Sequence, residues 1–177
     1  MENKAVKLNL GGTEKQEGGP NSPFLEGFTN IDIRGDLLGV DIVHDITSLP
    51  MFKDETVSEI RVSHTIEHIH PNNLIKALNE WYRILIPNGL LRIYCPDAEK
   101  IAKDFIEGKI SCEEFSRLLF GNQEYGENVH RLAMDRKRLD ELIESAGFEI
   151  ISRNSRPNAY KYDLGVQAKK VSKIYPY

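Results

Sequence analysis

A strand that ends in paired glycines constrains the fold of this chain more than any other feature. The apolar segment 6–10 leads directly into Gly11 and Gly12, and the next apolar segment, 31–33, contains Asp32. A glycine turn at the carboxyl end of a strand lets a ligand approach the backbone, and a carboxylate at the end of the next strand can bind a ribose diol. The pairing therefore predicts a site for a nucleoside cofactor.

Size and charge narrow the class of protein. With 177 residues, of which 40% are hydrophobic and 28% charged, the chain is expected to form one globular domain over residues 1–177. Its net charge of −4 provides no overall basic field, so nucleic-acid binding is not indicated. The sequence shows no apolar run long enough to cross a bilayer, no secretory signal, and two cysteines that do not suggest a disulfide framework. We expect a soluble cytoplasmic protein whose oligomeric state the sequence leaves open.

Segments with strand character alternate with helical patterns. Strands are expected at 6–10, 31–33, 41–45, 57–63 and 90–95, helices at 71–86, 111–121 and 135–147, and a turn at 87–89. Two further apolar segments, 148–152 and 164–171, are expected to pair antiparallel. This order predicts an α/β fold: a doubly wound, mostly parallel sheet with an antiparallel strand pair at its C-terminal end. The ligand crevice of such a sheet lies at the carboxyl ends of its strands.

The chain has more residues after the strand at 90–95 than a simple crossover helix needs. We expect residues 98–131 to form a helical insertion or lid over the crevice, because insertions at this edge vary the substrate. His130, near the end of this segment, is a candidate to accept a proton from a substrate. Asp97, at the end of the strand, is a second candidate catalytic residue, for contact with the acceptor substrate. The alternatives are a surface position for His130 and helix N-capping for Asp97.

Seven short motifs follow one another in a specific order along most of the chain. They are residues 8–11, 27–32, 44–46 with 49–50, 63–68, 80–85, 87–89 and 146–148. Their order resembles the small class I S-adenosylmethionine-dependent methyltransferases that have an Asn-Leu-Gly start and a Ser-His-x-x-Glu-His segment. The resemblance implies a Rossmann-like fold, S-adenosylmethionine as cofactor, and methyl transfer to an acceptor, for which we expect a small molecule or glycan-like metabolite.

The same resemblance assigns roles around the cofactor. Gly11 and Gly12 would pass close to the methionine moiety, Asp32 would accept hydrogen bonds from the ribose, and Asp45 would accept from the adenine amino group. The full set of implied cofactor residues is Leu10, Gly11, Gly12, Asp32, Ile33, Asp45, Ile46, Ser63 and His64. His64 would border the sulfonium, and with His130 and Asp97 it completes the catalytic candidates.

Two alternatives compete with a methyltransferase. Thr13 replaces a glycine that is usual in the family, and a polar segment after it suggests a reduced first crossover, so a cofactor-binding module without turnover is the first alternative. The second is a zinc hydrolase, because His64-x-x-Glu67-His68 matches an inverted zinc-protease motif. Since Pro71 begins the long helix after this motif, we do not expect both histidines on one helix, and we expect no metal.

Overall fold

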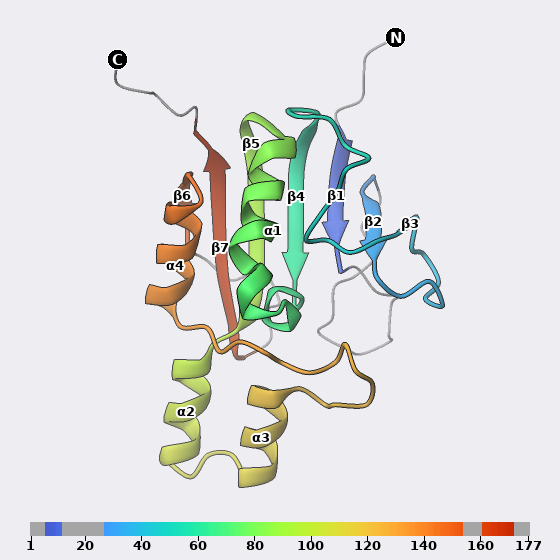
Figure 1. The fold of residues 1–177 in the computed structure, drawn as a ribbon. Helices are drawn as coiled ribbons and strands as arrows, with labels where there is room; N and C mark the ends of the chain where they lie inside the picture. The colour runs from blue at the N-terminus through green and yellow to red at the C-terminus, as the bar shows by residue number, and fades with distance from the viewer. Residues whose placement is uncertain (1–5, 12–26, 154–160, 172–177) are drawn as a thin grey trace.

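A single seven-stranded sheet organises the chain in the computed structural model, which describes residues 6–11, 27–153 and 161–171. The strands are β1 (Val6–Leu10), β2 (Thr29–Asp32), β3 (Ile42–Val43), β4 (Val57–Ser63), β5 (Leu85–Pro96), β6 (Phe148–Ser152) and β7 (Asp163–Lys170). Their order in the sheet is β3-β2-β1-β4-β5-β7-β6 (Figure 1). The first five strands pair in parallel, whereas β7 runs antiparallel to both β5 and β6. The predicted α/β fold with an antiparallel pair at its C-terminal end is confirmed.

Strand β5 differs most from its prediction. It begins at Leu85 and includes the expected turn at 87–89, where Asn88 adopts a left-handed φ of 63°. The pairing with β4 shifts at this point, because Val57 pairs with Leu85 and Glu59 with Leu90. The turn residues are therefore extra residues within the strand, and asparagine tolerates the left-handed backbone that they need.

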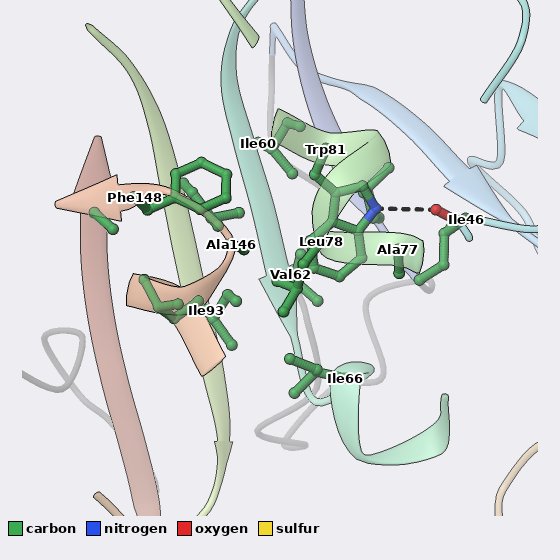
Figure 2. Packing of buried hydrophobic residues seen from close by; sticks show 14 of the residues in the cluster. Ile46, Ile60, Val62, Ile66, Ala77, Leu78, Trp81, Ile93, Ala146 and Phe148 are labelled. Atoms are coloured by element: carbon green, nitrogen blue, oxygen red, sulfur yellow. Dashed lines mark hydrogen bonds between the residues drawn. The ribbon is translucent and has the colours of Figure 1, made fainter. Parts of the chain in front are cut away.

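Helices α1 (Pro71–Ile84) and α4 (Arg136–Ser145) lie against one face of the sheet (Figure 1). Pro71 occupies the first turn of α1, where its missing N–H is not needed. The apolar side of α1 packs on the inward-facing residues of β4 and β5, such as Ile60 and Ile93, and Trp81 is fully buried at the centre (Figure 2). This layer forms the main core.

The opposite face of the sheet is polar. Glu59 on β4 pairs with Lys7 on β1 at 3.1 Å and with Arg92 on β5 at 2.7 Å. Within the described residues, no helix covers this face. The segment in which a reduced first crossover was expected falls largely within 12–26, outside the described residues.

Two further helices, α2 (Ala98–Ile106) and α3 (Cys112–Phe120), lie beyond the carboxyl ends of the parallel strands (Figure 1). They pack together through Ile101 and Leu118, with Tyr162 from the segment before β7. Ser111 caps α3 through the backbone N–H of Glu114, as its capping-box sequence predicts. None of the described helices combines the length and the apolar character that a membrane-spanning helix requires.

Candidate functional site

A pocket of about 360 Å³ lies where the parallel strands end. It is lined by Gly11, residues 32–34, 44–47, 64–65 and 68–70, Asn73, and three residues of the segment after α3, namely Tyr125, Glu127 and Arg131. The pocket therefore joins the ends of β1, β2, β3 and β4, as the fold predicts. Its volume falls within the range of pockets that bind small ligands and cofactors.

Gly11 lines the pocket, and no side chain fits at its position. Its φ of +69° is left-handed, and a Cβ built on it would lie 2.2 Å from the Cγ2 and Oγ1 atoms of Thr65. The hydroxyl of Thr65 lies 3.0 Å from the carbonyl oxygen of Ser63 and 3.3 Å from that of Leu10. The loop after β4 thus packs directly on the glycine turn after β1. Gly12, which the sequence also assigns to the cofactor, lies outside the described residues.

Asp32 places a buried carboxylate in the pocket at the end of β2. Its Oδ1 accepts a hydrogen bond of 2.8 Å from the backbone N–H of Arg34. Burial raises the pKa of Asp32, and the backbone N–H groups of Arg34 and Ile33 and the Arg34 guanidinium oppose that rise. A carboxylate that is held in this way and lines the pocket suits a pair of ligand hydroxyls.

The loop after β3 is held in place by a tryptophan of the core. Asp45 lines the pocket and its Oδ1 accepts from the backbone N–H of Thr47 at 2.8 Å. The carbonyl of Ile46 accepts a hydrogen bond of 2.9 Å from the indole Nε1 of Trp81 (Figure 2). Local sequence patterns do not indicate this contact, because it spans 35 residues of chain.

The side chain of His64 has partners that the sequence did not indicate. It has a left-handed φ of 50°, and its Nε2 lies 2.9 Å from Oδ1 of Asp163 on β7. Its Nδ1 lies 3.6 Å from Oε1 of Glu67. Burial alone lowers the pKa of His64, but the two carboxylates raise it to about 9. His64 is therefore a cation at neutral pH that pairs with two buried acids while its side chain borders the pocket.

The remaining residues that the sequence proposed fall into two groups. Ile33 lines the pocket, whereas Leu10 and Ser63 are buried and do not line it. Asp97 is the N-cap of α2, and its side chain accepts from the backbone N–H of Lys100 at 3.1 Å. His130 does not line the pocket either, and its ring lies edge-on behind the ring of His68, with 4.9 Å between the two centroids.

His68 is a pocket residue for which the sequence analysis proposed no role beyond the zinc alternative. It ends the short helix η1 (Ile66–His68), and its Nδ1 lies 3.1 Å from the carbonyl oxygen of Val129. Because His64 precedes this helix, the two histidines do not lie on one helix. The structure therefore lacks the helical pair that an inverted zinc-protease motif requires.

A cation–π contact joins two segments that line the pocket. The guanidinium of Arg34, after β2, lies 4.3 Å from the ring centroid of Tyr125, which belongs to the segment after α3. Asp36 holds the same guanidinium through an ion pair of 2.6 Å. The contact joins the predicted lid to the edge of the sheet.

We expect the variant Tyr125→Ala to bind an S-adenosyl ligand roughly 2- to 5-fold more weakly, because an exposed cation–π contact contributes about 0.5–1 kcal/mol. Calorimetric titration with S-adenosylhomocysteine measures this. Tyr125→Phe keeps the ring and serves as the matched control, with affinity expected to remain at the wild-type value. Equal losses in the two variants would contradict a role for the ring.

Comparison with known proteins places this geometry in context. The methyltransferase domain family matches residues 26–93. Among solved structures, the CurJ carbon methyltransferase has a TM-score of 0.60 and 14% identity over 95% of this chain, and this chain covers 49% of it. The chain thus spans about half the length of that protein. No curated protein sequence matches the chain.

Two other solved structures are similar over more of their own length. The 1,6-didemethyltoxoflavin-N1-methyltransferase of Burkholderia thailandensis, with bound 1,6-didemethyltoxoflavin and S-adenosylhomocysteine, has a TM-score of 0.62 and 16% identity, covering 95% of this chain and 72% of that one. An S-adenosylmethionine-dependent methyltransferase from Archaeoglobus fulgidus has a TM-score of 0.59 and 15% identity, covering 93% and 86%.

The strand order, the parallel core and the antiparallel β7 define a class I methyltransferase fold, which these structures share. The family match covers the segment that supplies Asp32, Asp45, Ile46 and His64. The chain is therefore similar to methyltransferases over residues 26–93 and shares their fold over most of its length.

Proposed function

We propose that this protein transfers a methyl group from S-adenosylmethionine to a small-molecule or glycan-like acceptor. The observation that carries the proposal is the buried carboxylate of Asp32, which ends β2 and lines one pocket with Gly11. This is the arrangement that binds a nucleoside ribose beside a close backbone turn. The solved relative from Burkholderia thailandensis contains S-adenosylhomocysteine, which supports the same cofactor here.

The described residues divide the pocket into two ends. Asp32, Ile33, Asp45 and Ile46 would hold the nucleoside, and Gly11 would pass close to the methionine moiety. The other end is lined by His64, His68 and the segment after α3. We assign this end of the pocket to the acceptor. We assign residues 98–131 to the lid that covers it.

Methyl transfer requires no covalent bond between the protein and the transferred group. A lone pair of the acceptor forms a bond to the methyl carbon as the carbon–sulfur bond breaks, S-adenosylhomocysteine leaves, and the acceptor releases a proton. Such an in-line displacement depends mainly on positioning. His64 is already protonated at neutral pH, so it suits orientation rather than proton removal. The pKa of His130 is lowered by its burial, so this ring is neutral, but it does not line the pocket and so does not contact the acceptor end directly.

Asp97 has no catalytic role in this proposal, because its side chain caps helix α2.

A cytoplasmic site of action is also part of the proposal, since Cys95 and Cys112 are both free thiols, as is usual in a reducing compartment.

The variant Asp32→Ala is expected to bind S-adenosylhomocysteine roughly 5- to 150-fold more weakly, which corresponds to the loss of about 1–3 kcal/mol from a buried, charged hydrogen bond. Calorimetry measures the affinity. Asp32→Asn keeps an acceptor for the Arg34 N–H and should lose less. Asp54→Ala, an exposed carboxylate that pairs with Arg83, is the control and should bind as the wild type does. Undiminished binding by Asp32→Ala would remove this residue from the ribose site.

Turnover separates an enzyme from a binding module. Protein incubated with methyl-labelled S-adenosylmethionine and a panel of small hydroxyl, amine and sugar acceptors should release labelled product and S-adenosylhomocysteine. Binding without transfer to any acceptor in a broad panel would favour the module that lacks turnover.

A further inference from the structure

One carboxylate and two imidazoles gather behind the acceptor end of the pocket. Atoms of Glu67, His68 and His130 that could act as metal ligands all lie within 4.8 Å of one another. Glu67 and His68 come from η1, and His130 comes from the segment after α3. The backbone holds the two parts together, because the N–H groups of Arg131 and Leu132 donate to the carbonyl of Glu67 at 2.7 and 3.2 Å.

Glu67 is unusual because it is buried without donors. Its side chain is 1% exposed, and within the described part of the chain neither carboxylate oxygen receives a hydrogen bond. Nδ1 of His64 lies 3.6 Å from Oε1 of Glu67, and Nε2 of the same ring lies 2.9 Å from Oδ1 of Asp163. A buried carboxylate that receives no hydrogen bond requires a partner, because an uncompensated buried charge is costly.

The surroundings of His68 match those of a metal ligand. A histidine that binds a metal almost always donates its other ring N–H to a backbone carbonyl or a carboxylate, which fixes the tautomer. Nδ1 of His68 lies 3.1 Å from the carbonyl of Val129, an arrangement that leaves the Nε2 lone pair available. Ligating carboxylates usually have donors nearby as well, and the His64 imidazole lies 3.6 Å from Oε1 of Glu67.

We propose that Glu67, His68 and His130 bind a divalent transition-metal ion, which we identify by its ligands as zinc. Two imidazoles and one carboxylate suit Zn²⁺, whereas Mg²⁺ prefers oxygen ligands. Ligand atoms of a tetrahedral zinc site are about 3.3 Å apart, so the side chains must draw in by about 1 Å. Because His68 also lines the pocket, a metal ion bound to it would lie beside the acceptor end.

This site differs from the zinc motif that the sequence contains. The motif would use His64 and His68, but the fold directs His64 to Asp163 and brings in His130 from 62 residues beyond His68 in its place. It also differs from the expectation, based on the sequence, that the protein holds no metal, and the titration below decides between the two. Metal binding can be measured without methyl transfer, so the inference does not depend on the proposed function.

The test is a titration of chelator-treated full-length protein with Zn²⁺ in competition with a chromophoric chelator. The wild type should bind about one Zn²⁺ per chain with micromolar or tighter affinity, and Mg²⁺ should not compete. Glu67→Gln, His68→Gln and His130→Gln should each weaken binding by at least about 100-fold, more than the loss of a supporting contact would. His44→Gln, a histidine that lines the same pocket outside the cluster, is the matched control and should bind as the wild type does.

Bound Co²⁺ provides a readout on the unmodified protein, in case a variant does not fold. Its visible absorption should show a four- or five-coordinate site with nitrogen ligands, and Zn²⁺ should displace it. The inference is overturned if the wild type binds no Zn²⁺ at micromolar concentration. It is equally overturned if folded His68→Gln and His130→Gln bind zinc normally, or if binding needs His64 but not His130.

Discussion

Replacing Gly11 by alanine is expected to weaken the binding of S-adenosylhomocysteine by about 100-fold, a loss in the upper part of the range expected for Asp32→Ala. The added Cβ would lie 2.2 Å from Thr65 side-chain atoms and 2.7 Å from the Thr65 Cβ, so the turn after β1 and the loop after β4 must separate. A misplacement of about 1 Å at a reacting site can cost a factor of 100 in rate, and we expect a loss of the same order in affinity because the backbone no longer approaches the cofactor closely. Calorimetric titration of the folded variant measures the change in affinity.

The control for this variant is Gly108→Ala. Gly108 has a similar left-handed φ of +71°, but a Cβ built there meets no atom within 4 Å. This variant should lose about 1–2 kcal/mol of stability from backbone strain and keep its affinity for the cofactor. If both variants bound equally well, the close approach of Thr65 would not matter for the site.

A double variant tests the mechanism of the clash. Thr65→Gly removes the atoms that the new Cβ would meet, so Gly11→Ala should cost less affinity in a Thr65→Gly background than in the wild type. The difference between the two costs is the coupling between these positions. Strictly additive losses would show that the left-handed backbone of Gly11, rather than the contact with Thr65, sets the requirement for glycine.

Local signals predicted most of the fold. The strands at 57–63 and 148–152 have the predicted bounds, and Ser111 and Asp135 cap helices as their positions indicate. These features depend on periodicity and capping, which act over a few residues. The same is true of Asp32 and Gly11, because the end of a parallel strand is recognisable from its own sequence and determines where the side chain lies.

Local sequence patterns could not predict the acceptor end of the site. His64 reaches Asp163, 99 residues later in the chain, and His68 meets His130 only because the segment after α3 folds back on η1. The order of the strands places β7 beside β5, and no local pattern specifies which side chains then meet across them. The motif His64-x-x-Glu67-His68 thus suggested a pair of histidines, whereas the fold separates that pair and selects another partner.

Trp81 shows how the core and the cofactor site share one residue, and its removal should have the largest effect on stability. The side chain is fully buried, so Trp81→Ala is expected to destabilise the protein by about 3–5 kcal/mol, the range for deleting a large aromatic core residue. That is a large part of the roughly 5–15 kcal/mol that a domain of this kind possesses. Chemical denaturation monitored by circular dichroism measures the loss.

The milder variant Trp81→Phe separates packing from the hydrogen bond to Ile46. Phenylalanine keeps most of the buried volume but leaves the Ile46 carbonyl without its 2.9 Å donor, at a cost of about 1–3 kcal/mol. Because Ile46 lines the nucleoside end of the pocket, this variant should also bind S-adenosylhomocysteine several-fold more weakly.

Leu78→Ala is the matched control, since Leu78 is equally buried on the same helix and donates no side-chain hydrogen bond. It should lose about 2–5 kcal/mol of stability and, while folded, keep its affinity. If Leu78→Ala weakened cofactor binding as much as Trp81→Phe, the effect would follow from general loosening of the core, and the indole would have no separate role in holding the loop after β3.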